Sequence, residues 1–288
     1  MKKRVLFCGE HPASMAGNGN MMAAVLSQVN TEKYDFACFC VHDVDPINSV
    51  FDPYRFTIIN ATTSNDYWGS ERLLSLLHRA DLDILFFVGI DIWRYANIWG
   101  RVLHLREQRK FKLIFLFPYD VQNIRTDWAK MAASCDIPLV YSEYGERVLK
   151  PLVPHIRYFR PPLYNAELFG PVDVIRRDEF PTLRDDAVLF GFIGNNQIRK
   201  SPERLMKAFF MAKRENPDMT LYLHTDMEGV YNLKQLAMDY GAKTGDLLQK
   251  RPGAKYPPDK MVRVYNALDC LVNCTIQEGL SWTPLEAM

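Results

Sequence analysis

The sequence predicts an α/β fold built from two domains, each with a parallel sheet. Short apolar runs rich in β-forming residues alternate with amphipathic helical segments along the 288 residues. This alternation is typical of a parallel sheet that helices cover on both faces. A length of roughly 100 to 200 residues per domain gives about two domains. A charged, irregular stretch, 172–186, separates the two series of elements and is expected to be a linker.

The first domain, 1–171, is expected to contain six strands and five helices. The strands are expected at 4–8, 36–41, 56–59, 83–88, 112–117 and 138–141, and the helices at about 20–28, 70–79, 93–108, 124–133 and 143–150. The second domain, 187–288, repeats the pattern, with strands at 187–193, 219–224 and 268–273 and helices at 201–214, 232–240 and 258–267. Ligands of such sheets bind at the carboxyl ends of strands, so the polar residues that follow each strand are the site candidates.

The composition of the chain excludes several classes of function. Hydrophobic residues make up 48% of the chain, which is enough for two cores, and the formal net charge is +1. Without a basic stripe, nucleic acid is not expected as a partner. The longest apolar run, 84–88, is too short to span a bilayer, and the first ten residues do not form a signal peptide. We therefore expect a cytoplasmic protein without an integral membrane segment. Neither a disulfide nor zinc is expected, because Cys8, Cys38, Cys40 and Cys270 fall inside apolar strands as reduced core residues and the other two cysteines, Cys135 and Cys274, lack metal-ligand spacing.

Two glutamates, Glu278 and Glu286, stand at the two ends of a loop that follows the last expected strand. Pro284 suits the first position of a helix there, because its φ is fixed and it has no N–H to leave unpaired. The free N–H groups of a helix start attract anions, so the two acids bracket a candidate phosphate site. An alternative is a capping box of Thr283 and Glu286. Both readings can hold, since a carboxylate has two oxygens.

A basic pair, Arg199 and Lys200, lies between the strand at 187–193 and a helix that Ser201 and Pro202 are expected to open. Cations at this place can neutralise a departing diphosphate, because charge-assisted contacts to phosphate are stronger than neutral ones. The alternative is an ordinary solvated turn.

Four further positions are weaker candidates. Gly17 and Gly19 lie in an expected glycine-rich turn, where glycine lets the backbone approach a ligand and adopt positive φ. Asp91 follows the strand at 83–88 and either binds an acceptor or sugar hydroxyl or caps the next helix. His224 ends the strand at 219–224 and either faces a nucleotide or satisfies local hydrogen bonds. Two D-x-D matches, 43–45 and 81–83, have the pattern of a metal site, but such pairs arise often by chance.

The run 278–288 closely resembles the signature of retaining nucleotide-sugar glycosyltransferases of family 4, E-G-F-G-x-x-x-x-E-A-M. Residues 194–201 resemble that family's G-R-x-x-x-x-K-G segment, with Lys200 at the lysine position and Asn195 in place of the arginine, and 159–171 resembles the segment that closes its first domain. The resemblance implies the GT-B fold, two Rossmann-like domains facing a cleft. It implies that Glu278 approaches the donor sugar, Glu286 the ribose, and Lys200 with Arg199 the diphosphate. The expected donor-binding residues also include Gly279, Leu280, Ser281, Asn195, Gly17 and Gly19 by this resemblance, and His224 by its place at the end of a strand.

The implied reaction is the transfer of a hexose, with retention, from a nucleotide-diphosphate donor to a glycan, lipid or protein acceptor in glycan biosynthesis. The resemblance implies neither a metal nor another cofactor. A nucleotide-sugar epimerase of the same architecture and an inactive sugar-nucleotide binding fragment remain alternatives. The sequence departs from the family in two ways. Asp91 is the nearest polar residue to the place of the usual histidine after the fourth strand, and the chain ends at the signature, so we expect a C-terminally truncated member with an incomplete second domain.

Overall fold

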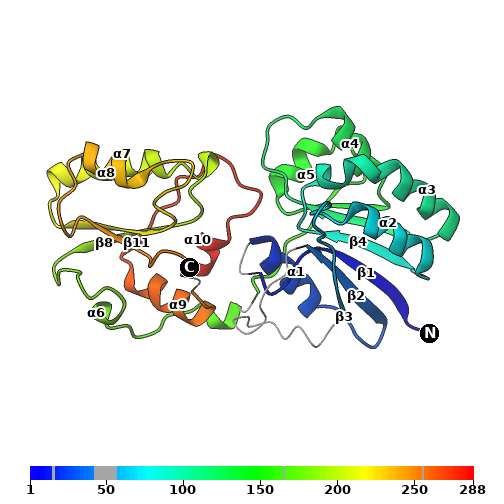
Figure 1. Cartoon of the computed structure of the whole chain (residues 1–288), viewed down its shortest axis with the longest axis horizontal. Coiled ribbons are helices and arrows are strands. Elements are labelled where there is room, and N and C mark those ends of the chain that lie inside the picture. Colours follow the sequence, from blue (N-terminus) through cyan, green and yellow to red (C-terminus); the bar gives the residue numbers. More distant parts are fainter. Residues whose placement is uncertain (15–16, 42–56, 165, 255) are drawn as a thin grey trace. The chain divides into compact units, whose positions relative to one another are not determined.

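The computed structural model describes residues 1–14, 17–41, 57–164, 166–254 and 256–288. The chain divides into two compact units, Met1–Tyr164 and Asn165–Met288, and each contains one parallel sheet (Figure 1). The predicted α/β class with two sheets is confirmed. Within the described residues, no helix combines the length and apolarity that crossing a membrane requires.

The first unit is built on a parallel sheet of seven strands in the order β3-β2-β1-β4-β5-β6-β7. The strands are β1 Lys3–Glu10, β2 Tyr34–Val41, β3 Thr57–Asn60, β4 Ile84–Val88, β5 Lys112–Phe117, β6 Ile137–Val140 and β7 Arg157–Tyr158. The helical segments are α1 Gly17–Ser27, α2 Ser70–Arg79, η3 Ile92–Ile98, α3 Trp99–Arg109, α4 Thr126–Ala133 and α5 Glu143–Leu149. The strand order reverses between β1 and β4, which is the switch point where sheets of this kind bind ligands.

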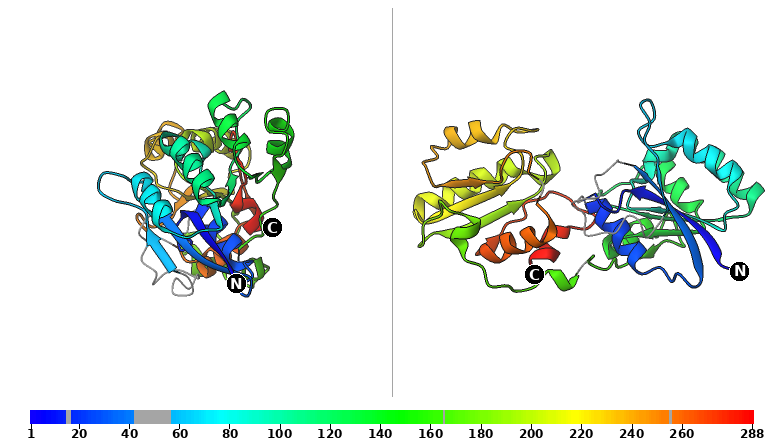
Figure 2. Two further views of the ribbon diagram at one scale, coloured as in Figure 1. Left: turned by 90° about the vertical axis from the view of Figure 1, so that its right-hand side faces the viewer. Right: turned by 60° about the horizontal axis from the view of Figure 1, so that its bottom comes forward.

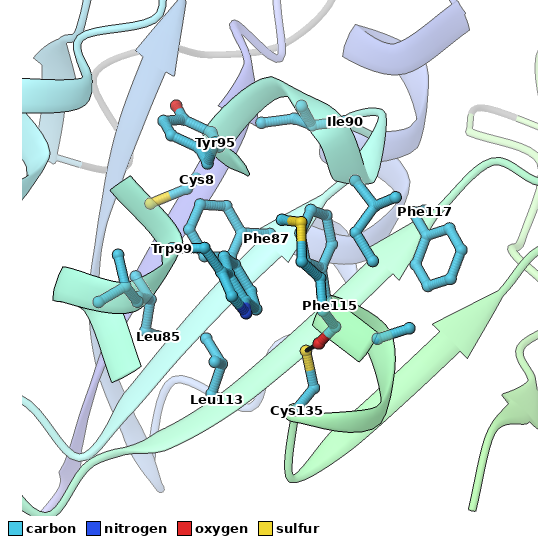
Figure 3. Packing of buried hydrophobic residues seen from close by; sticks show 14 of the residues in the cluster. Cys8, Leu85, Phe87, Ile90, Tyr95, Trp99, Leu113, Phe115, Phe117 and Cys135 are labelled. Carbon is cyan, nitrogen blue, oxygen red and sulfur yellow. Dashed lines mark hydrogen bonds between the residues drawn. The ribbon is translucent and has the colours of Figure 1, made fainter. Parts of the chain in front are cut away.

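Helices cover both faces of the first sheet, because successive strand residues point to opposite faces. Leu6 and Cys8 of β1 belong to the buried cluster that also holds residues of α2, η3, α3 and α4. Gly9 faces the other way, and a Cβ there would meet Met22 of α1 at 2.4 Å. Figure 3 shows the aromatic centre of the cluster, where Phe87 and Phe115 stack with ring centroids 4.8 Å apart.

The second unit has a four-stranded parallel sheet in the order β10-β9-β8-β11. The strands are β8 Val188–Ile193, β9 Met219–His224, β10 Leu247–Gln249 and β11 Cys270–Leu271. The helical segments are η4 Ala166–Leu168, α6 Arg176–Glu179, η5 Ile198–Lys200, α7 Pro202–Glu215, α8 Leu233–Asp239, α9 Pro258–Ala267 and α10 Trp282–Ala287. Helices α7 and α8 pack on one face of the sheet and α6 and α9 on the other (Figures 1 and 2).

The stretch expected to be a linker, 172–186, packs within the second unit. Phe180 and Leu183 are buried in one cluster with Tyr222 of β9. Beside them the carboxylate of Glu179, whose side chain is 2% exposed, pairs with Lys260 and with Arg263 Nε at 2.5 Å. The stretch therefore contributes buried apolar and charged contacts to the second unit.

We expect Glu179→Gln to lower the free energy of unfolding by about 2 kcal/mol. Breaking a buried ion pair costs roughly 3 to 5 kcal/mol, and the cost here is smaller because both cations remain partly in water. Urea denaturation measures the change. Asp178→Asn, at the exposed neighbouring residue, is the control, and equal losses in the two variants would show that Glu179 has no special role.

The contribution of Glu179 also has a pH dependence of known sign. Burial raises the pKa of its carboxyl, but hydrogen bonds from Lys260 and Arg263 outweigh burial and hold this pKa below its ordinary value of 4.5. A carboxylate with a lowered folded pKa stabilises the protein fully above pH 4.5, and this contribution is lost as the pH falls below it.

Several elements differ from the expectation. The strand expected at 268–273 forms ladder contacts only at Cys270–Leu271, and Cys270 is exposed rather than buried, because β11 lies at the edge of its sheet. The helix expected at 93–108 is divided into the 3₁₀ segment η3, in which Tyr95 (φ −108°, ψ 17°) departs from helical geometry, and α3, which begins at Trp99. The two-residue β7 and three-residue β10 were not predicted, because such short strands show no periodicity.

Candidate functional site

Charged and polar side chains gather where the strands of the second sheet end. Lys250 follows β10, His224 ends β9, Arg199 and Lys200 lie in η5 after β8, and Glu278 lies in the loop after β11. All four strands run parallel, so their carboxyl ends share one edge of the sheet. This is the edge at which the sequence predicted a site.

Glu278 is held by both members of the predicted basic pair. Arg199 Nη1 donates to Glu278 Oε2 at 2.6 Å, and Lys200 Nζ donates to Glu278 Oε1. The side chains of Lys200 and Glu278 are 15% and 18% exposed, and that of Arg199 is 39% exposed. The fold thus brings Glu278 to Arg199 and Lys200, which lie 79 and 78 positions before it in the sequence. Two cations balance one carboxylate.

The backbone on both sides of these ion pairs is fixed. The N–H of Ile276 donates to the carbonyl of Arg199 at 2.8 Å, and Cys274 Sγ donates to the carbonyl of Lys200 at 3.2 Å. A Cβ at Gly194 would lie 3.7 Å from Cδ of Lys200, so the lysine stem crosses over the end of β8. The loop after β11 and the segment η5 therefore hold the charged groups in one place.

Helix α7 begins at Pro202, as predicted, but Ser201 does not cap it through its side chain. The Ser201 backbone is left-handed (φ 46°, ψ 48°), and its hydroxyl donates backwards to the carbonyl of Ile198 at 3.2 Å. A non-glycine residue in this region carries strain of the kind that persists where the surroundings require it. Asn195, which replaces the family's arginine, is exposed and carries no charge.

Glu286 lies in a different environment from Glu278. Its Oε2 accepts a hydrogen bond of 2.7 Å from the hydroxyl of Tyr265 in α9. Burial raises the pKa of the Glu286 carboxyl, and this hydrogen bond offsets only part of that rise. Helix α10 begins at Trp282, so the prediction that Pro284 is the first helical residue is wrong.

The capping box considered for the end of this loop does not form. Ser281 precedes the helix in place of Thr283, and its side chain makes no capping hydrogen bond. Its hydroxyl instead accepts from Asn273 Nδ2 at 3.2 Å, while Gly279 and Leu280 are half-buried in the loop. The six-residue helix α10 packs against α9.

His224 makes the local hydrogen bond that was one of its two predicted roles. Its Nδ1 lies 2.8 Å from the hydroxyl of Tyr222, and its ring meets that of Tyr256 edge-on at 4.9 Å. Burial, and then the positive charge of Lys250, lower the pKa of His224 to about 4. The imidazole is therefore neutral at pH 7.

This lowered pKa predicts a loss of stability in mild acid. Between pH 6.5 and about 4 the unfolded chain binds a proton at His224 that the folded chain does not, so the free energy of unfolding falls as the pH is lowered through this window. Urea denaturation at several pH values should show a weaker dependence in His224→Gln than in the exposed control His104→Gln. Identical pH profiles for the two variants would contradict the assignment.

Two threonines with buried hydroxyls at this edge were not predicted as site residues. Thr225 Oγ1, directly after β9, and Thr275 Oγ1, in the loop after β11, have no hydrogen-bond partner within the described ranges. Their place after a strand was a signal for them, but threonine alone is too common there to single out. Tyr265, the partner of Glu286, lies within a helix and gave no signal.

The candidates of the first unit are placed differently from the prediction. Gly17 and Gly19 lie in the first turn of α1, so the glycine-rich turn expected there is wrong, and Gly19 does not have a positive φ. Glycine at 19 instead lets the helix approach the preceding loop, since a Cβ there would meet Ser14 Oγ at 2.1 Å. Asp91 pairs with Arg94 at 3.3 Å and makes no side-chain capping hydrogen bond.

The D-x-D match at 81–83 is engaged in contacts with Arg4. Asp81 Oδ2 pairs with Arg4 Nη2 at 2.5 Å and Asp83 accepts from the N–H of Arg4 at 2.7 Å, at the amino end of β4 and away from the ligand-binding edge. The match at 43–45 lies outside the described residues. Within the ranges described, no three or more His, Cys, Asp or Glu side chains are grouped to hold a metal ion.

Comparisons with known proteins identify the fold. No protein-family model matches the sequence, and no curated protein sequence matches it significantly. Sucrose-phosphate synthase from Thermosynechococcus elongatus is similar over 99% of this chain and 79% of its own, with a TM-score of 0.72 and 15% identity. HepE of Anabaena, solved with UDP-glucose, is similar over 94% of this chain and 74% of its own, with a TM-score of 0.65 and 9% identity. A glycosyltransferase from Rickettsia africae is similar over 96% of this chain and 73% of its own, with a TM-score of 0.66 and 11% identity.

These similarities extend over at least 94% of this chain, so they cover both of its sheets. At 9 to 15% identity they establish the fold and not the substrate. The chain therefore has the GT-B fold of glycosyltransferases, as its motifs predicted.

Proposed function

We propose that the chain is a retaining glycosyltransferase of family 4, which transfers a sugar from a nucleotide-diphosphate donor to a hydroxyl acceptor without a metal ion. One observation carries the proposal: Arg199 and Lys200 converge on Glu278 at the carboxyl edge of the second sheet. The GT-B fold and the sequence signature support it, and so does the UDP-glucose bound to the structurally similar HepE.

In this proposal the ion pairs of Glu278 hold the place of the donor. The diphosphate replaces the carboxylate as the partner of Arg199 and Lys200, because phosphate oxygens form strong charge-assisted hydrogen bonds with both. Glu278 is released and accepts hydrogen bonds from hydroxyls of the donor sugar. The basic pair thus changes its partner, while the acid changes from a counterion into a sugar ligand.

The same cations then assist the chemistry. As the bond between the anomeric carbon and the diphosphate breaks, negative charge grows on the departing oxygen, and Lys200 and Arg199 stabilise it. Their charge takes the role that a metal ion would otherwise have. The attacking hydroxyl approaches the anomeric carbon from the face that the diphosphate leaves and passes its proton to the departing diphosphate oxygen. This retains the anomeric configuration without a carboxylate nucleophile of the glycosidase type.

A thermal-shift panel tests donor binding. UDP-, GDP- and ADP-glucose are each added to the chain, and we expect at least one to raise the melting temperature by several degrees. A ligand at 100 times its Kd stabilises by about 2.7 kcal/mol, and 1 kcal/mol corresponds to roughly 2 to 4 °C for a protein of this size. No shift with any nucleotide sugar would contradict the proposal.

Analysis of the products tests the reaction itself. With a donor labelled in its sugar, a transferase gives the free nucleoside diphosphate and a labelled acceptor or free sugar. An epimerase instead returns the label in an altered nucleotide sugar. A donor that binds and is never consumed would favour a binding module.

A further inference from the structure

A groove runs between α2 and α3 of the first unit, which pack side by side (Figure 1). Its volume is about 500 Å³, and small-molecule sites usually have roughly 300 to 1,000 Å³. Residues three or four positions apart share one face of a helix, so each helix lines the groove with one face. The charged and titratable lining residues are Glu71, His78 and Arg79 of α2 and Arg101 and His104 of α3. We call it the α2–α3 groove.

The floor of the α2–α3 groove is part of the core. Leu74 and Leu105 line the groove, are 5% and 2% exposed, and belong to the large buried cluster of the first unit. Side chains packed in a core keep fixed positions. The groove therefore has a preformed apolar base between two polar walls.

The walls of the α2–α3 groove carry a surplus of positive charge. Arg79 and Arg101 contribute two guanidinium groups, and Glu71 is the single carboxylate among the described residues that line the groove. Arg109 adds a third guanidinium where α2 ends, because its Nη2 donates to the carbonyl of Ala80 at 3.1 Å. Protonation of the two histidines adds further positive charge.

One of these cations is already held by the carboxylate. Arg101 donates from Nη1 to Glu71 Oε2 at 3.0 Å and from Nη2 to Glu71 Oε1 at 2.5 Å. The other three groups, His78, Arg79 and His104, make no side-chain hydrogen bond or ion pair among the residues that the structure describes. Several unpaired donors around one groove favour an anion from outside the chain.

We propose that the α2–α3 groove binds a small organic phosphate, a phosphomonoester with an uncharged body. A phosphomonoester carries a charge of about −1.5 to −2 at pH 7 and accepts several hydrogen bonds, so it matches this set of donors. Its phosphate binds Arg79, His78 and His104, and its body lies on Leu74 and Leu105. The site is formed by α2 and α3 alone, and the inference does not depend on the proposed glycosyl transfer.

NMR titration of the whole chain tests the ligand class, with the imidazole signals of His78 and His104 as the local readout. The probes are glycerol 3-phosphate and phenyl phosphate, compared with glycerol, phenol, inorganic phosphate and succinate at pH 7. We expect at least one phosphomonoester to move both signals. Its dephosphorylated parent should not move them, and inorganic phosphate should bind about fivefold more weakly because it leaves the apolar base uncovered.

Two variants of the groove should change the affinity in opposite directions. Arg79→Gln should weaken binding of the phosphomonoester by about tenfold, the effect of one lost charge-assisted hydrogen bond. Glu71→Gln should tighten it by about threefold, because it removes a competing carboxylate and releases Arg101 for the ligand.

The controls make the same charge changes on the second unit. Arg214→Gln and Glu215→Gln alter exposed residues in the last turn of α7 and should leave the affinity unchanged. Melting temperatures without ligand should stay close to that of the parent chain in all four variants. Arg79 has no partner to lose, and the ion pair of Glu71 with Arg101 is exposed, so it adds little stability.

Four results would overturn the inference. The first is that neither phosphomonoester moves the two imidazole signals. The second is that inorganic phosphate binds as tightly as the esters, which means an adventitious ion only. The third is that succinate binds more tightly than both esters, which would assign the groove to carboxylates. The fourth is that Lys200→Met abolishes binding while Arg79→Gln leaves it unchanged, which would place the phosphate on the basic pair of the second unit.

Discussion

Lys200→Met is expected to reduce kcat/KM for sugar transfer by about 100- to 1,000-fold, the range found when one preorganised group that stabilises a transition-state charge is removed. Lys200 is half-buried beside Glu278, and methionine keeps a flexible apolar stem to lie over Gly194 while losing the ammonium. Because negative charge on the diphosphate grows as the bond breaks, kcat should fall more than KM rises.

Steady-state kinetics with the donor found in the thermal-shift panel measures this effect. Lys207→Met is the matched control, since it removes the same charge from an exposed position of helix α7. A decrease of less than about threefold in Lys200→Met, or an equal decrease in both variants, would remove Lys200 from the reaction.

Glu278→Gln is expected to weaken sugar transfer and to strengthen binding of the free nucleoside diphosphate. Transfer should fall by about 100-fold, because the amide cannot accept from sugar hydroxyls as a carboxylate does. Binding of the free nucleoside diphosphate should become about tenfold tighter. The carboxylate that competes for Arg199 and Lys200 is gone, and the two cations are free for phosphate.

Titration calorimetry with the nucleoside diphosphate measures its affinity, and a transfer assay with the nucleotide sugar measures the activity. Glu215→Gln, at the exposed end of α7, controls for the lost charge. If Glu278 only supports the local structure, Glu278→Gln should lower the melting temperature and weaken diphosphate binding together. That result would exclude the exchange of partners.

Most of the fold could be predicted because buried strands leave a clear pattern. The apolar runs at β4, β5 and β9 lie within one residue of their expected bounds, since parallel strands buried on both faces are apolar throughout. Segments whose role depends on distant partners were harder to predict. Phe180 and Leu183 lie in a charged stretch, and nothing local indicates that they pack against Tyr222.

The place of the candidate site could be predicted from the strands, but the contacts within it could not. Arg199, Lys200 and Glu278 each follow a strand, and the carboxyl ends of neighbouring parallel strands must meet. The ion pairs among them, and the pairing of Glu286 with Tyr265, depend on tertiary packing that no local pattern specifies.

The central claim is that a nucleotide diphosphate exchanges places with Glu278 on the basic pair. A crystal structure of the chain with the nucleotide sugar that gives the largest thermal shift tests it most directly. We expect diphosphate oxygens within about 3 Å of Lys200 Nζ and of the Arg199 guanidinium, with the Glu278 carboxylate turned to the sugar hydroxyls. A donor bound elsewhere, with Glu278 still paired to Lys200 and Arg199, would contradict the account.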